Sequence, residues 1–229
     1  MKKIIDLCKL FIYFDTNNLR SISDKEVVYN KFELSNGFYR IENYLKRTSL
    51  SNNVTLAISE IVLMELIEQK INQYNSDKEN YYKLKETVKT KYEKLKEMDE
   101  KISMLTQSKY IEGFELKVKD YSFDCPSAIS EMAKEYISKK EIEIVKVPEE
   151  TPIKATIFDS MIKRAIRKQY PFQKYNSNGK NFSDAGFKDV LIWESLLNYN
   201  GIKTYDEVIF VTGDNVFINC ISEFNELVS

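Results

Sequence analysis

The nine residues LFIYFDTNN, at positions 10–18, join a continuous apolar run to an acid and a polar loop. Such a run is typical of a strand that is buried on both faces of a parallel sheet. Open parallel sheets bind their ligands in the loops at the carboxyl ends of the strands. We therefore expect Asp15 to lie at a functional site, although an acid in this position can equally close the strand as an Asx turn.

Apolar runs of this kind recur along the chain and alternate with helical patterns. Further strands are expected at 54–58, 142–147 and 208–211, with a weaker candidate at 114–118. Helices are expected at 36–46, from 59 to 74, from 151 to about 168, from Ser183 to just before Gly201, and over the last residues of the chain. This order indicates an α/β fold with a mostly parallel sheet.

The composition bounds the chemistry of the chain. Its 229 residues are 43% apolar, enough for the core of one large domain, and its 34 basic and 35 acidic residues give no overall bias toward nucleic acid. The chain contains no histidine, which excludes Ser-His and Cys-His nucleophile pairs, and its three distant cysteines disfavour a disulfide framework or a zinc site. We expect a cytoplasmic protein with no export signal and no membrane span.

The composition changes at Ser76, where a mostly charged segment begins. Residues 76–79, Ser-Asp-Lys-Glu, have the form of a capping box, so a new helix is expected to start there. A helix of about 30 residues spans roughly 45 Å, which is too long for an ordinary crossover. We therefore expect residues 75–140 to form a helical arm inserted in a single domain, 1–229. Its apolar stripe would pack on residues 127–139, on a second copy of the chain or on a partner protein.

A basic and aromatic run lies between residues 161 and 182 and contains no acid. Basic side chains can hold phosphates, and aromatic rings can stack on unpaired bases. The cations near the end of the expected helix are also explained by the helix dipole alone. The candidate nucleic-acid-binding residues in this run are Lys163, Arg164, Arg167, Lys168, Tyr170 and Phe172.

Four acids occupy comparable positions in the expected fold. Asp15 and Asp214 follow apolar strands, and Glu65 and Asp189 lie in the early turns of helices. Because parallel strands bring such positions to one edge of the sheet, we expect these carboxylates to converge. Crowded carboxylates repel one another unless a divalent cation neutralises them, and oxygen ligands suit Mg²⁺ or Mn²⁺ better than zinc.

Four segments resemble motifs of the PIN-domain nucleases and occur in that family's order. They are FDTNNL (14–19), ISEIVLMEL (58–66), SDAGFKDVLIWESLL (183–197) and VIFVTGDNVF (208–217). The resemblance implies a three-layer α/β/α fold and endoribonuclease chemistry dependent on Mg²⁺ or Mn²⁺. By motif, it implies catalytic and metal-binding roles for Asp15, Glu65, Asp189 and Asp214, a metal-binding role for Asp184, and supporting roles for Asn17 and Thr212.

Single-stranded RNA is the expected substrate, because an unpaired strand can place its bases on aromatic side chains. The segment 75–140 departs from the small toxin-type members of the family. The alternative is a non-catalytic PIN-like protein that binds RNA or a partner through the helical arm. A phosphatase similar to the haloacid dehalogenases would also begin with a strand and an acid, but it requires a second acid where this chain has Asn17.

Overall fold

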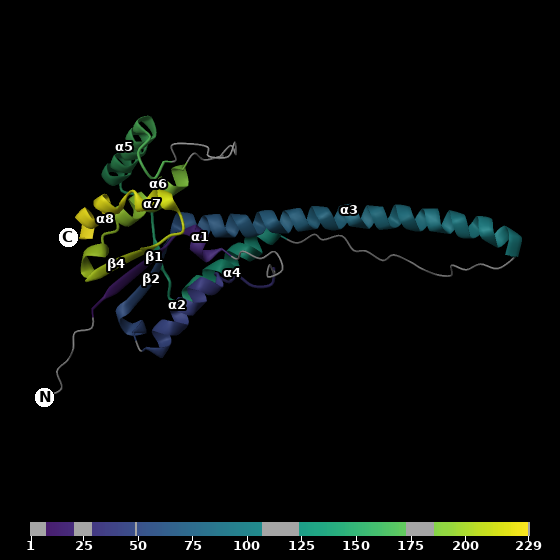
Figure 1. Ribbon diagram of the computed structural model, residues 1–229, viewed down its shortest axis with the longest axis horizontal. Helices are drawn as coiled ribbons and strands as arrows, with labels where there is room; N and C mark the ends of the chain where they lie inside the picture. The colour runs from purple at the N-terminus through teal and green to yellow at the C-terminus, as the bar shows by residue number, and fades with distance from the viewer. Residues whose placement is uncertain (1–7, 21–28, 49, 107–123, 173–185, 229) are drawn as a thin grey trace. The chain divides into compact units, whose positions relative to one another are not determined.

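The computed structural model describes residues 8–20, 29–48, 50–106, 124–172 and 186–228 (Figure 1). The chain divides into two compact units, one made of Met1–Glu68 with Ile129–Ser229 and the other of Gln69–Ala128. The second unit interrupts the first along the sequence. Within the described residues, no helix is both long enough and apolar enough to cross a lipid bilayer.

A four-stranded parallel sheet organises the first unit, with the strand order β3-β2-β1-β4. Its strands are β1 (Leu10–Phe14), β2 (Val54–Ser59), β3 (Glu143–Val145) and β4 (Glu207–Val211). The end of β1 lies level with the ends of both neighbours, because Phe14 is paired with Ile58 on one side and with Val211 on the other. This confirms the expected α/β fold and places the acids that follow β1 and β4 on adjacent strands.

Strand β1 is buried on both faces, as its apolar run predicts. Phe11 and Tyr13 face one side, where the Tyr13 hydroxyl donates to the carbonyl of Ile192 over 3.0 Å. Phe14 faces the other side and meets the edge of Phe38 at a ring-centroid distance of 5.4 Å. Since successive residues of a strand point to opposite faces, these contacts require a helical layer on each side of the sheet.

Several helices of the first unit supply these layers and the loops between them. Phe38 belongs to α2 (Asn36–Arg47) and Ile192 to α6 (Phe187–Leu197). Helix α6 begins after Gly186, whose backbone φ of 87° suits glycine. The start expected at Ser183 lies outside the described residues, as does the candidate strand at 114–118. The remaining elements are α1 (Thr16–Leu19), α5 (Thr151–Arg167), α7 (Asn215–Ile218), α8 (Ile221–Val228) and the short 3₁₀ turns Ser51–Asn53 and Ile202–Thr204.

Helix α3 runs without interruption from Glu60 to Thr106 and connects the two units along the chain. The expectation of a separate helix starting at Ser76 is therefore wrong. No glycine or proline occurs between residues 60 and 106, and Gln73 donates to the Asp77 carboxylate over 3.0 Å, across the expected boundary. A capping-box sequence begins a helix only where the preceding residues leave the helical conformation, and here they do not.

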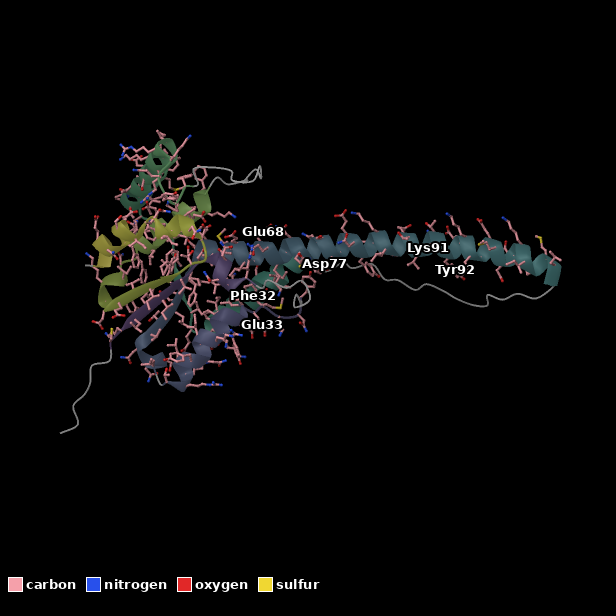
Figure 2. All side chains as sticks on the ribbon, viewed as in Figure 1. Phe32, Glu33, Glu68, Asp77, Lys91 and Tyr92 are labelled. Atoms are coloured by element: carbon pink, nitrogen blue, oxygen red, sulfur yellow. The ribbon has the colours of Figure 1, made fainter. Side chains whose placement is uncertain are left out.

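The second unit contains the charged part of α3 and the beginning of α4 (Cys125–Lys139). Figure 2 shows side chains of both charge signs along this part of α3, with Lys91 and Tyr92 labelled. The apolar stripe includes Leu84, Val88, Leu95, Met98, Ile102 and Leu105, which are between 44% and 90% exposed. Packing of this stripe on residues 127–139, on a second copy or on a partner stays a prediction.

Arg164 attaches α5 to the rest of the first unit. Its side chain is only 12% exposed, and it donates to Glu194 on α6 over 3.2 Å, to the Tyr170 carbonyl over 2.6 Å and to Glu223 on α8. Glu223 also accepts from the indole nitrogen of Trp193 over 3.0 Å. Burial opposes the charge of Arg164, but the hydrogen bond and negative charge of Glu223, with the charge of Glu194, raise its pKa overall. The guanidinium therefore contributes to the fold.

Replacing Arg164 by alanine should destabilise the protein strongly, because the carboxylate of Glu194 would stay buried without its cation. Losses of about 3–5 kcal/mol are typical when one partner of a buried ion pair is removed. The matched control is Arg167→Ala, at an exposed cation one turn later on the same helix, where we expect a change within about 0.5 kcal/mol. Urea denaturation followed by circular dichroism measures both. Equal losses in the two variants would contradict the structural role of Arg164.

Candidate functional site

Asp15 lies at the carboxyl end of β1 and is 3% exposed. Its backbone N–H donates to the Val211 carbonyl of β4 over 3.0 Å, which extends the sheet by one residue. One carboxylate oxygen, Oδ1, accepts from the Thr16 N–H over 2.7 Å, and the other, Oδ2, accepts from the Thr212 hydroxyl over 3.1 Å. Asp15 thus caps α1, but it does so through the N–H of the next residue and not through the N–H two residues on that defines an Asx turn. Its buried carboxylate lies where the ends of β1 and β4 meet.

Thr212 joins the acid after β1 to the acid after β4. While its hydroxyl donates to Asp15, the same oxygen accepts from the Asp214 N–H over 3.0 Å. The Asp214 carboxylate in turn accepts from the Val216 N–H over 3.0 Å, which fixes it at the start of α7. The loop after β4 is therefore held beside the end of β1 by side-chain hydrogen bonds in addition to the sheet.

Glu65 reaches the same place from the second turn of α3. Its Oε2 accepts from the Thr16 hydroxyl over 2.7 Å, next to Asp15 in sequence, and its Oε1 accepts from the Lys188 ammonium over 3.0 Å. Lys188 lies in the first turn of α6 and immediately precedes Asp189. Segments from β1, α3, β4 and α6 therefore converge, although they are far apart along the chain.

Burial raises the pKa of Asp15 to about 6. Hydrogen bonds from Thr16 and Thr212 oppose this rise, and the negative charges of Asp214 and Glu65 add to it. The carboxylates of Asp214 and Glu65 are thus close enough to disfavour the ionisation of Asp15. A cation between them would remove that cost, because it would favour the charged form of each acid.

The oxygen donors present here fit a divalent cation of the Mg²⁺ or Mn²⁺ type, since they are carboxylates and hydroxyls without thiolate or imidazole. The described residues contain no group of three or more acidic or cysteine side chains already gathered as a metal cage. Asp189 lies in the first turn of α6, where it interacts with other residues. Asp184 lies outside the described residues. Joint metal binding by Asp15, Glu65, Asp189 and Asp214 stays a prediction.

The asparagines after Asp15 differ in their roles. Asn17 is exposed, whereas the side-chain amide of Asn18 donates to the Val211 carbonyl over 3.3 Å. The Asn18 carbonyl also accepts from the Ser35 hydroxyl, which caps α2. Asn18 therefore connects the loops around the site. Its partners lie 17 and 193 residues away along the chain, so no local pattern distinguishes it from its neighbour.

The basic run divides between the fold and the surface. Arg164 is engaged in the ion pairs that attach α5, whereas Lys163, Arg167 and Lys168 are exposed. Lys168 ends α5 in the left-handed conformation, with φ of 51°, so its backbone has a capping role while its ammonium remains at the surface. These three cations are the members of the predicted set whose charges face solvent.

The predicted aromatic residues are less accessible than the sequence suggests. Phe172 is 5% exposed and packs edge-on against Phe187 at a ring-centroid distance of 5.0 Å, so its ring belongs to the core. Tyr170 is half-buried. Phe187 itself is 47% exposed and was not a candidate, although it stands two residues before Asp189 in the quoted motif. Thr16 and Lys188, which bind Glu65, were also missed.

The comparisons with known proteins place the chain in one family. A family model described as a PIN domain matches residues 12–217, which include all four predicted acids and both threonines of the site. No curated protein and no solved structure matched the chain. PIN domains are generally nucleases that bind nucleic acid and use divalent metal ions. Since the match covers most of the sequence and agrees with the parallel sheet and the acids at its strand ends, the chain belongs to the PIN-domain family.

Proposed function

We propose that this protein is a metal-dependent endoribonuclease that cleaves phosphodiester bonds in single-stranded RNA. The observation that carries the proposal is the approach of Glu65 and Asp214 to the buried carboxylate of Asp15, at the carboxyl ends of adjacent parallel strands. Membership of the PIN-domain family supports nuclease chemistry at this position. The free cysteines suit a reducing compartment, so we propose the cytoplasm as the place of action.

Asp15, Glu65, Asp189 and Asp214 are the proposed ligands of Mg²⁺ or Mn²⁺, with Asp184 as a further candidate. When bound, such an ion supplies the positive charge that stabilises the phosphate and the leaving oxygen as negative charge develops during cleavage. The choice among these metals rests on the oxygen donors of the site, since this part of the chain offers carboxylates and hydroxyls and the whole sequence has no histidine.

The chain's own residues position the carboxylates before a substrate arrives. Thr212 orients one oxygen of Asp15 and holds the backbone of Asp214, and the Thr16 N–H orients the other oxygen of Asp15. Thr16 uses its hydroxyl to orient Glu65 as well. Because the sheet and these hydrogen bonds fix the acids in advance, little reorganisation is needed during the reaction, which is the main source of electrostatic catalysis.

Positive charge beside the acids supports an approaching phosphate. The side chain of Lys188 is 43% exposed, and its ammonium lies 3.0 Å from Glu65. Lys163, Arg167 and Lys168, on and just after α5, are further exposed cations that could bind other phosphates of the strand. A single strand is favoured over a duplex because its bases can leave the stack and contact protein groups such as Phe187 and Tyr170.

Cleavage of mixed-sequence RNA with Mg²⁺ or Mn²⁺ tests the proposal. Asp189→Asn should lower the cleavage rate roughly 100-fold or more, as loss of one charge-stabilising group does in other enzymes, while RNA affinity is kept or rises because a negative charge is lost. Asp15→Asn should have the same effect on cleavage. The control is Glu149→Gln, which removes an exposed acid outside the site. Unchanged metal-dependent cleavage by Asp15→Asn and Asp189→Asn would overturn the proposal.

The raised pKa of Asp15 predicts how stability depends on pH in the presence of a chelator. The folded protein holds the proton of Asp15 more tightly than the unfolded chain, so the free energy of unfolding should fall as pH rises from about 4 to about 6. A difference of about 2 pKa units corresponds to at most about 3 kcal/mol. Asp15→Asn removes the charge, so it should be more stable than the parent at pH 7 and about equal to it at pH 4.

Urea denaturation of both proteins at pH 4 and pH 7, with the chelator present throughout, measures this difference. Asparagine keeps an acceptor for the Thr16 N–H, so the local backbone contact survives the change. An Asp15→Asn variant that is less stable than the parent at pH 7 would contradict the cost assigned to the buried charge.

A further inference from the structure

A pocket of about 620 Å³ lies between α5 and the residues that lead from α7 into α8. We call it the α5–α8 pocket; Figure 1 shows these helices in green and yellow beside α6. One face of α5 forms its first wall, and Asn219 to Glu223 form the opposite wall. The complete lining is Thr156, Asp159, Ser160, Lys163, Arg164, Arg167, Gln169, Tyr170, Asn219, Cys220, Ser222 and Glu223. None of these residues belongs to the acid site.

The unpaired charges that line this pocket are two cations and one acid. Lys163 and Arg167 lie one turn apart on the face of α5 that lines it, and among the described residues neither side chain has an ion pair or a hydrogen bond. Asp159, one turn before Lys163, is the acid, so cations outnumber it at this wall by two to one. Arg164 lies between them, but its charge is balanced by Glu194 and Glu223. Two cations one turn apart and uncompensated in this way can hold a phosphate by charge-assisted hydrogen bonds.

The remaining lining groups suit the other parts of a nucleotide. Tyr170 contributes an aromatic ring, which any base can stack on. Gln169 and Asn219 contribute amides, which can donate to and accept from the edge of a base. Thr156, Ser160 and Ser222 add hydroxyls. The volume of about 620 Å³ falls within the range of roughly 300–1,000 Å³ that small-molecule sites occupy.

We propose that the α5–α8 pocket binds one nucleotide unit of the RNA strand, away from the scissile phosphate, and reads its base. Lys163 and Arg167 hold the phosphate of that unit, Tyr170 stacks on its base, and the amides of Gln169 and Asn219 contact the base edge. The inference rests on the proposed function, because it assumes that the strand reaching the acids is RNA. The inference also predicts that the enzyme prefers a particular base at a nucleotide of the RNA that the acids do not contact.

Helix α6 connects this pocket to the acid site. Glu194, which fixes Arg164 at the pocket, lies five residues after Asp189 on α6, a rise of roughly 7.5 Å along a helix axis. Trp193, the single tryptophan of the chain, donates its indole N–H over 3.0 Å to the pocket residue Glu223. The pocket and the acids are therefore held at a fixed spacing along one short helix. A nucleotide bound in the pocket would set which bond of the strand meets the acids.

The first experiment measures nucleotide binding without any cleavage. The four nucleoside 5′-monophosphates are titrated into the full chain with a chelator present, and the fluorescence of Trp193 is followed. We expect saturable changes with unequal affinities for the four bases. Lys163→Ala/Arg167→Ala should weaken binding about tenfold or more, since two charge-assisted contacts are lost. Lys154→Ala is the control, because Lys154 is exposed on the same helix and is not part of the lining.

The second experiment uses short single-stranded RNA in filter binding across a salt series, with the chelator still present. The double variant should reduce the slope of log affinity against log salt by about 1.4, or about 0.7 for each lost phosphate contact. Equilibrium dialysis measures the binding of any monophosphate that does not change the fluorescence of Trp193. Binding of monophosphates without any change of the RNA salt slope would overturn the strand assignment and point to a free nucleotide instead.

The outcomes separate this inference from the proposed nuclease activity. Base-dependent nucleotide binding that Lys163→Ala/Arg167→Ala weakens supports the pocket even if the protein shows no cleavage. Absence of nucleotide binding by both fluorescence and dialysis overturns the pocket even if cleavage depends on Asp15. In the parent protein, cleavage products should carry a preferred base at one fixed distance from the cut, and the double variant should lose this preference.

Discussion

The structure depends on one costly arrangement, a carboxylate buried at the end of the central strand. Asp15 follows a strand that is covered on both faces, and its side chain is buried in the folded protein. Thr16 and Thr212 satisfy its oxygens, and nearby carboxylates still oppose its charge. An asparagine at this position could also cap α1, without the cost of burying a charge. In the function proposed above, a divalent cation compensates this charge.

Helix α6 has contacts with both the acid site and the α5–α8 pocket. Its first turn carries Lys188, which meets Glu65, and its last turns carry Trp193 and Glu194, which hold Arg164 and α8. The same short helix therefore joins the acids to the α5–α8 pocket.

The strands and the acids that follow them could be predicted from the sequence, because each is marked by a few consecutive residues. Apolar runs that end in acids identified β1 and β4 and placed Asp15 beside Asp214. The continuity of α3 was missed because a capping motif was given more weight than the absence of glycine and proline across it. The buried role of Arg164 was missed because charge spacing does not distinguish a surface cation from one paired with Glu194, 30 residues away.

Calorimetric titration of Mn²⁺ into the parent protein and into Asp15→Asn tests the central claim most directly, because it measures binding at the carboxylates without a substrate. The raised pKa of Asp15 predicts binding that releases protons at pH 6 and far fewer at pH 8, visible when buffers of different ionisation enthalpy are compared. Asp15→Asn should lose most of the affinity and the proton release. Equal Mn²⁺ affinity and equal proton release in the two proteins would contradict the account.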